Sequence, residues 1–162
     1  MNRLNCRPLV TIAIATVLIA SSTSGKKVQF TDCGKGQVKS LDISPCEDEP
    51  CAFVPGVNMD VIVEFEASAA AEPSDHKMIV DFVSIDIEYP GFNEDICQKL
   101  QCPLVPGQLY NYTFAIPVQE YLPSMVTTVT WQAGLNPHVF CAQTTIGFEG
   151  SGSNETPSPE IH

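Results

Sequence analysis

Alternation of apolar and polar side chains, with Ile62 as an exception, is the feature that most limits how this chain can fold. Residues 57–67 put four apolar side chains on one face of an extended chain, namely Met59, Val61, Val63 and Phe65. The same period of two returns in residues 109–118 and 125–133. Because successive side chains of a β-strand point to opposite faces, each segment predicts a strand with one buried face.

Four further segments have strand character, and they span residues 28–31, 37–43, 77–89 and 139–148. In the 77–89 run the apolar phase changes between Phe82 and Val83, which predicts a bulge or bend. Turn-forming segments separate the runs, and one of them, "PGFNED", directly follows Tyr89. The absence of a convincing amphipathic helix completes the pattern. It predicts an all-β fold, an immunoglobulin-like β-sandwich of about seven antiparallel strands, with an interior that is either filled or hollow.

The first 25 residues do not fit this pattern. Arg3 and Arg7 precede an apolar run of about a dozen residues, Leu9–Ala20, and small residues stand at Thr23 and Gly25. This layout predicts a secretory signal peptide over residues 1–25. A transmembrane anchor is the alternative, but the run is shorter than the ~20 residues that a spanning helix needs. Residues 26–149 would then form one folded domain, and the polar residues 150–162 a disordered tail.

The charge of the secreted part excludes one class of partner. Cleavage after Gly25 removes both arginines and leaves six lysines against 19 acidic residues, so the formal net charge becomes 6 − 19 = −13. A surface of this sign repels phosphate backbones. We therefore expect no nucleic-acid partner.

Six cysteines remain after the signal peptide: Cys33, Cys46, Cys51, Cys97, Cys102 and Cys141. An even number in a secreted chain predicts three disulfides, for which 15 pairings exist. Cys46 with Cys51 and Cys97 with Cys102 can each close a short loop, which leaves Cys33 for Cys141. A zinc site and a redox pair are the alternatives. The spacing favours neither, because zinc sites pair cysteines two to four apart and redox sites use C-x-x-C.

Motifs for catalysis are absent from the sequence. It contains no G-x-S-x-G, H-E-x-x-H, P-loop or dinucleotide fingerprint, so we expect no enzyme activity, cofactor or metal site. His76 follows "EPSD" and is expected on the surface of a loop. Two sequons predict N-glycosylation at Asn111 and Asn154, and Asn111 falls on the polar face of its strand.

Several short segments occur in a characteristic order: "VQFTDCG", "ISPCEDEPC", "CQKLQCPLVPGQLYNY", "IPVQEYLPS", "VTWQ" and "FCAQ". In order and spacing they resemble the ML lipid-recognition family, which includes the Niemann-Pick type C2 sterol-transfer proteins and the mite group 2 allergens. The resemblance runs from about Val28 to Phe148. It implies a two-sheet immunoglobulin-like fold with an apolar pocket between the sheets. It also implies the disulfides Cys33–Cys141, Cys46–Cys51 and Cys97–Cys102.

Twelve side chains are expected to bind a ligand, from the inward strand faces and from the resemblance: Val61, Val63, Phe65, Ile87, Tyr89, Tyr112, Phe114, Val118, Tyr121, Leu122, Val129 and Trp131. Tyr89, Val118 and Leu122 match positions around the pocket mouth of the sterol-transfer members, where Tyr89 adds a hydroxyl group to an aromatic ring. Tyr121 adjoins Leu122. The Cys97–Cys102 loop follows Tyr89 and is expected to hold it in place.

The resemblance implies a secreted lipid-binding and lipid-transfer protein that carries a sterol or a fatty-acid-like ligand. It would act outside the cell or in the endolysosomal lumen, with transient contact to membranes or to a membrane protein that receives the lipid. An innate-immune lipid-recognition module and a semiochemical carrier of an arthropod are the alternatives. A phosphorylated glycolipid would need cations at the mouth, whereas residues 85–96 carry four acidic side chains and no cation.

Overall fold

The computed structural model describes residues 25–67, 75–134 and 138–150. Within them lie ten strands and one short 3-10 helix, η1 (Ile96–Gln98). The strands are β1 (Lys26–Lys27), β2 (Thr31–Asp32), β3 (Val38–Ser44), β4 (Cys51–Phe53), β5 (Asn58–Glu66), β6 (Asp75–Phe82), β7 (Ile85–Asp95), β8 (Leu109–Pro117), β9 (Met125–Ala133) and β10 (Phe140–Phe148). Seven of these have seven or more residues. The prediction of an all-β sandwich of about seven strands is confirmed.

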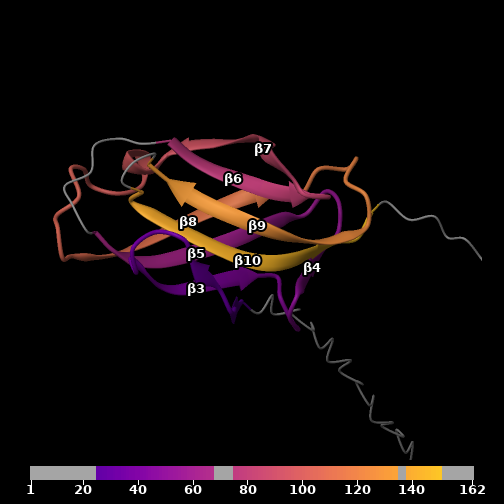
Figure 1. Cartoon of the computed structure of the whole chain (residues 1–162), viewed down its shortest axis with the longest axis horizontal. Coiled ribbons are helices and arrows are strands. Elements are labelled where there is room, and N and C mark those ends of the chain that lie inside the picture. The colour runs from indigo at the N-terminus through magenta and orange to yellow at the C-terminus, as the bar shows by residue number, and fades with distance from the viewer. Residues whose placement is uncertain (1–24, 68–74, 135–137, 151–162) are drawn as a thin grey trace, which may run out of the picture.

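The strands form two sheets that lie one over the other (Figure 1). One sheet has the order β1-β3-β5-β8, and the other has the order β2-β10-β9-β6-β7. All these neighbours are antiparallel, whereas β4 pairs with β10 in parallel, on the edge that β2 also occupies. At the opposite edge of the sandwich, the outermost strand is β8 in the first sheet and β7 in the second.

The core lies between the sheets and follows from the alternation in the sequence. Along β5 every second side chain is fully buried, and these are Met59, Val61, Val63 and Phe65. On β8 and β9 the same period buries Tyr112, Phe114, Val129 and Trp131. Burying one large apolar side chain contributes about 1.5–3 kcal/mol, so the facing rows are the main source of stability.

The 77–89 run is not one bent strand. It is a hairpin of β6 and β7, in which Val83 and Ser84 form a tight two-residue turn. Both residues have positive φ angles, 52° and 67°, as the favoured turn of a two-residue hairpin requires. The amide of Ser84 donates to Asp81 Oδ1 over 2.9 Å. The change of phase that predicted a bulge or bend marks this chain reversal, so that prediction was wrong.

The segment "PGFNED" is not the expected turn between strands, so that prediction was wrong; it lies within β7, which bulges where the segment starts. β7 continues through Pro90 to Asp95, and between its paired ends one residue of β6, Met78, faces residues 89–92 of β7. A proline is tolerated here because β7 is an edge strand, where a missing N–H leaves no ladder bond unmade. The extra residues turn both Tyr89 and Phe92 towards the interior, where both are buried.

The three disulfides have the expected pairing. Cys33–Cys141 joins the end of β2 to β10, with 5.0 Å between the Cα atoms. Cys46–Cys51 leads from the end of β3 to β4 and so connects the two sheets. Cys97–Cys102 closes the turn around η1.

The remaining expectations concern the two ends of the chain, the glycosylation sites, metal binding and membrane-spanning helices. The signal peptide up to residue 24, the tail from residue 151 and the sequon at Asn154 lie outside the described residues. Asn111 is exposed on the outer face of β8, and its glycosylation stays a prediction. No group of metal-ligating side chains occurs in the described ranges. Over the same ranges, no helix has the length and apolar character needed to cross a membrane.

Candidate ligand-binding interior and its open edge

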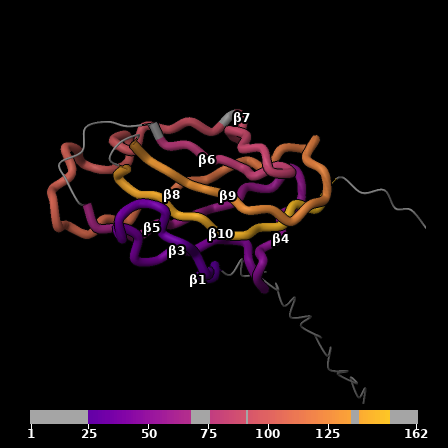
Figure 2. The backbone as a smooth tube through the Cα atoms, viewed as in Figure 1, coloured from indigo at the N-terminus to yellow at the C-terminus, as the bar shows by residue number. Residues whose placement is uncertain are grey.

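The two long edges of the sandwich are connected in different ways. Along one edge the chain passes from β1 in the first sheet to β2 in the second, and Cys46–Cys51 makes a second crossing beside it. Figure 2 shows β1 and β4 along this edge and β7 along the opposite one. Strands β7 and β8 are the outermost strands of their sheets. Side-chain hydrogen bonds connect them along their length, and at one end the chain itself passes from β7 through η1 to β8. We call this second side the open edge.

Most of the predicted ligand-binding side chains point into the space between the sheets. Nine are buried: Val61, Val63, Phe65, Tyr89, Tyr112, Phe114, Val118, Val129 and Trp131. Leu122 is partly buried and packs against the core. Ile87 is 45% exposed although it lies directly opposite the buried Val80, because it stands near the hairpin end of an edge strand. Tyr121 is 68% exposed, beyond the end of β8.

Tyr89 closes one end of the open edge. It is 3% exposed, and its hydroxyl donates to the carbonyl of Pro117 over 2.9 Å and accepts from the amide of Gln119 over 3.0 Å. These two groups flank Val118, so the structure places Tyr89 beside Val118; that the two residues frame a pocket mouth stays a prediction. Burial raises the pKa of the Tyr89 hydroxyl, which therefore stays protonated and able to donate.

The Cys97–Cys102 loop does not hold Tyr89. Tyr89 bonds to the last residue of β8 and to the connection that follows it, whereas the disulfide lies beyond the C-terminal end of β7. The expectation failed because β7 continues for six residues past Tyr89 before η1 begins.

A second polar link crosses the open edge near that end. The hydroxyl of Tyr112 on β8 donates to Glu94 Oε2 on β7 over 2.7 Å. Glu94 also pairs with Lys99 at 2.8 Å, and His76 Nδ1 lies 3.2 Å from the Tyr112 oxygen. Burial and the Glu94 carboxylate raise the pKa of the Tyr112 hydroxyl well above its usual value. Tyr112 is therefore a permanent donor that ties the two edge strands together.

His76 is a buried part of β6, and its expected place on a surface loop was wrong. It has 0% exposed surface, and its ring packs edge-on against Phe114, Phe92 and Tyr112 with centroids 4.3, 4.7 and 5.2 Å away. Burial, helped by the nearby Lys99 cation, lowers the pKa of His76 to about 3. The imidazole is therefore neutral at physiological pH. A signal was present in the sequence, because His76 continues the inward phase of Met78 and Val80.

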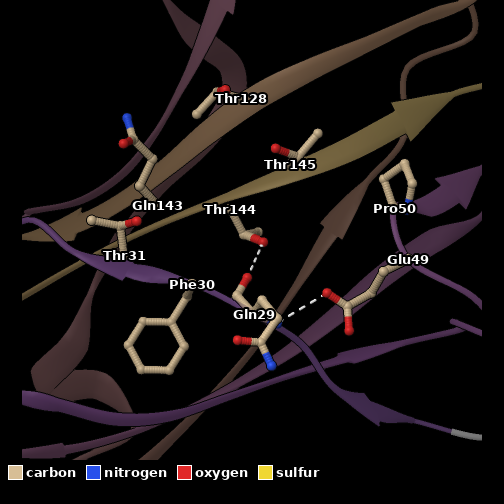
Figure 3. A pocket seen from close by; sticks show the side chains of 9 residues that line it. All are labelled: Gln29, Phe30, Thr31, Glu49, Pro50, Thr128, Gln143, Thr144 and Thr145. Carbon is tan, nitrogen blue, oxygen red and sulfur yellow. Dashed lines mark hydrogen bonds between the residues drawn. The ribbon is translucent and has the colours of Figure 1, made fainter.

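A surface pocket of about 540 Å³ lies away from these residues (Figure 3). It sits where β2 and β4 leave a gap along β10, and it is lined mainly by polar groups: Gln29, Phe30, Thr31, Glu49, Pro50, Thr128, Gln143, Thr144 and Thr145. Thr144 donates to the carbonyl of Gln29 over 2.6 Å, and the amide of Gln29 donates to Glu49 over 3.0 Å. None of the twelve predicted ligand-binding residues lines it.

The comparisons with known proteins agree with this architecture. The model of the ML domain family matches residues 27–148. NPC intracellular cholesterol transporter 2 from Bos taurus is 28% identical over 145 residues, which cover 86% of this chain and 97% of the bovine protein. Mite group 2 allergen Tyr p 2 from Tyrophagus putrescentiae is 30% identical over 116 residues, which cover 72% of this chain and 82% of the allergen.

A solved structure shows the same fold. The crystal structure of a Niemann-Pick type C2 protein from the Japanese carpenter ant superposes with a TM-score of 0.67 at 18% identity. The superposition covers 75% of this chain and all of the ant chain. The family match, which spans most of the chain, and the shared two-sheet fold lead to one conclusion. This protein belongs to the ML domain family.

Proposed function

We propose that this protein is a secreted lipid-binding and lipid-transfer protein that holds a sterol or a fatty-acid-like ligand between its two sheets. The observation that carries the proposal is the pair of facing apolar rows, on β5 and β8 in one sheet and on β6 and β9 in the other, in a chain of the ML domain family. Two of the relatives named above are, by name, a cholesterol transporter and a Niemann-Pick type C2 protein. The ligand would replace contacts between these rows.

Binding requires the sheets to move apart, because the inward side chains now contact one another closely. Val63, Tyr112 and Trp131 each have 0% exposed surface. A ligand that buries ~400 Å² of apolar surface gains ~10 kcal/mol at ~25 cal/mol per Å², before the costs of association and of opening the interior. Separation at the open edge would break the few hydrogen bonds of Tyr89 and Tyr112. We therefore place the entrance between β7 and β8, with Ile87, Tyr89, Val118, Tyr121 and Leu122 around it.

Native mass spectrometry of the protein secreted from cells, followed by lipid extraction, tests the proposal. We expect a bound species that the extract identifies as a lipid, and uptake of cholesterol or oleic acid by delipidated protein. A protein that carries no lipid and takes up neither compound would contradict lipid binding.

A matched pair of variants locates the ligand. Val61→Phe adds a ring inside the sandwich, whereas Ile62→Phe adds the same ring on the outer face of β5, where Ile62 is 41% exposed. Overpacking costs about 1–3 kcal/mol, so both variants are first compared by thermal unfolding. We expect Val61→Phe to lower lipid uptake several-fold and Ile62→Phe to leave it unchanged. Equal uptake by both variants would place the ligand elsewhere.

The charges along the open edge bear on the kind of lipid. Lys77 and Lys99 are both paired with acids, Glu88 at 3.0 Å and Glu94 at 2.8 Å. A phosphorylated headgroup would have to compete with these carboxylates. An apolar lipid with a small uncharged headgroup fits the edge better. An immune module for such a lipid, or a semiochemical carrier, would use the same interior with a different cargo.

A further inference from the structure

The surface pocket of about 540 Å³ lies on the edge of the sandwich opposite the open edge. Its volume falls within the ~300–1,000 Å³ that ligand pockets in proteins have. Thr128 and Thr145 on its wall belong to the outer face of the second sheet, so the pocket opens to solvent and not to the interior. Glu49 and Pro50 belong to the loop that the Cys46–Cys51 disulfide closes, so a covalent bond limits the movement of this wall.

The pocket exists because an antiparallel ladder stops at this point. β2 pairs with β10 as far as Thr31, which lies opposite Gln143. Two residues further in the same register, Gln29 would lie opposite Thr145 and exchange backbone hydrogen bonds with it. The amide of Gln29 instead donates to Glu49 Oε2 over 3.0 Å (Figure 3). The chain therefore turns away from the sheet before Gln29 can cover the edge of β10.

The interruption directs a backbone donor into the pocket. The amide of Cys33 donates to the carbonyl of Cys141 over 3.0 Å, so every second residue of β10 from there on, Thr145 included, points its backbone groups towards this edge. Thr144 is 8% exposed, and its hydroxyl donates its hydrogen to the carbonyl of Gln29 over 2.6 Å. The Thr144 oxygen can then only accept from a ligand. The fold itself thus supplies a donor and an acceptor.

The other side chains on the wall add neutral polar groups and some apolar surface. Among the lining residues that the structure describes, Glu49 is the one ionisable side chain, and its second carboxylate oxygen can accept from a ligand. Phe30 and Pro50 contribute apolar surface. Hydroxyl and amide groups that both donate and accept come from Gln29, Thr31, Thr128, Gln143 and Thr145.

A neutral sugar matches this set of groups. Each hydroxyl of a sugar ring can donate and accept, and the C–H groups of the ring provide apolar surface. An anionic ligand would approach Glu49 without a cation on the wall to pair with it. An ammonium ligand would satisfy Glu49 but would offer no acceptor to the Thr145 amide, because it only donates.

We propose that the surface pocket binds a neutral sugar residue, either free or at the end of a glycan. The Thr145 amide and the Glu49 carboxylate would bond hydroxyl groups of the ring, and Phe30 and Pro50 would contact its C–H surface. The proposal does not depend on lipid binding, because the pocket and the interior lie on different sides of the second sheet. It gives the protein a second ligand at the edge that stays closed when the open edge parts.

Titration of the mature, disulfide-bonded protein at pH 7.5, followed by NMR of its backbone amides, tests the proposal. The neutral probes are methyl glucoside, methyl mannoside and N-acetylglucosamine. Glucuronate carries a negative charge on the same kind of ring, and choline carries a positive charge. We expect a neutral sugar to bind with a Kd of about 1 mM and to shift the amide resonances of Gln29 and Thr145. Glucuronate and choline should bind roughly tenfold more weakly or less.

The two sources of the sugar are compared directly. A glycopeptide that ends in the sugar that binds should match or exceed the free sugar if the ligand is a glycan. A glycopeptide that binds roughly tenfold more weakly would assign the pocket to the free sugar.

A matched pair of variants locates the sugar. Thr128→Trp fills the pocket, whereas Gln132→Trp places the same ring further along the outer face of β9, beyond the lining residues. We expect Thr128→Trp to weaken sugar binding roughly tenfold or more and Gln132→Trp to leave it unchanged. Thermal unfolding first shows that both variants fold.

A third variant tests the charge and remains informative if Thr128→Trp fails to fold. Glu49→Gln keeps an acceptor for the Gln29 amide and removes the negative charge. We expect the affinity for the neutral sugar to stay within about twofold, and that for glucuronate to rise towards it.

Four results would each overturn the sugar site and leave lipid binding intact. They are the absence of binding by any neutral sugar well above the expected Kd, tighter binding of choline or glucuronate than of the sugars, sugar-induced shifts away from Gln29 and Thr145, and equal sugar affinity in Thr128→Trp and Gln132→Trp.

Discussion

At the scale of single residues, the hydroxyl group of Tyr89 connects the two sheets at the proposed entrance. It bonds to Pro117 and Gln119, on either side of Val118. Phenylalanine would keep the ring in the interior and lose both bonds. The hydroxyl therefore contributes to the closed state of the entrance, and its loss would change the rate of opening more than the shape of the interior.

Tyr89→Phe should speed the release of bound lipid. A hydrogen bond contributes about 1 kcal/mol net, so we expect release to become roughly fivefold faster and the unfolding free energy to fall by about 1 kcal/mol. Stopped-flow release of a fluorescent sterol measures the rate. Tyr110→Phe is the control, because Tyr110 also accepts from a backbone amide, that of Val105 at 2.9 Å, in the loop before β8. An equal acceleration in both variants would refute the role of Tyr89.

His76 makes stability depend on pH. Its pKa is about 3 in the folded protein and near 6.5 when unfolded, so the unfolded chain binds more protons between these values. Stability is complete above pH 6.5 and is lost as the pH falls towards 3. Lys99, Glu94 and Tyr112 are the titratable groups around the ring. We expect about 2 kcal/mol less stability at pH 5 than at pH 7.5 from this residue.

Urea unfolding at both pH values measures this loss. His76→Asn should remove that part of the pH dependence. His138→Asn should retain it, since His138 binds the carbonyl of Gly134 outside the core. A pH dependence unchanged by His76→Asn would assign the effect to other groups.

At the scale of elements, alternation predicted the long strands and their buried faces, because a period of two has one physical cause. It could not predict the hairpin. A two-residue turn with positive φ angles is usually announced by Asn or Gly, whereas this one uses Val83 and Ser84. The bulge at Pro90 was not predicted either, because its residue types are equally common in ordinary loops. His76 was wrongly predicted to lie on a surface loop, because the polar segment "EPSD" precedes it. Its position on the same strand face as the apolar residues that follow it was not used.

The sequence predicted the part of the candidate site that lies in the interior of the sandwich. The inward side chains of β5, β8 and β9 were identified by their phase, and Tyr89 and Val118 by resemblance. The link between Tyr112 and Glu94 was not, because it joins residues whose strands pair with different neighbours and meet only across the open edge. No local pattern records such a contact.

The turn of the hairpin offers a test of its conformation. Val83 is β-branched, has φ of 52° and is 81% exposed, so it contributes strain and little burial. The double change Val83→Asn with Ser84→Gly supplies the residues that this turn prefers. We expect the unfolding free energy to rise by about 1 kcal/mol, as measured by urea denaturation. A decrease would mean that Val83 makes a contact that offsets the strain.

At the scale of the whole molecule, acidity controls approach to membranes. The expected net charge of −13 repels anionic lipid at neutral pH and shrinks as carboxylates protonate. We expect faster lipid transfer to phosphatidylserine vesicles at pH 5 than at pH 7, as followed by fluorescence dequenching. Vesicles of phosphatidylcholine alone should show a smaller difference. Equal rates on anionic vesicles at both pH values would count against action in an acidic endolysosomal lumen.

The Cys46–Cys51 bond gives the sandwich a fixed side. The disulfide fixes the sheets at one edge. Along the other edge they are joined by side-chain hydrogen bonds and, at one end, by the chain as it passes from β7 through η1 to β8, so the sheets would part most easily along β7 and β8. The space so created is a wedge, narrow beside the disulfide and wide beside β7 and β8. The shape of the ligand would then matter as well as its polarity. Reduction of the disulfide would loosen this edge without opening it, because the backbone still crosses there from β1 to β2 and from β3 to β4.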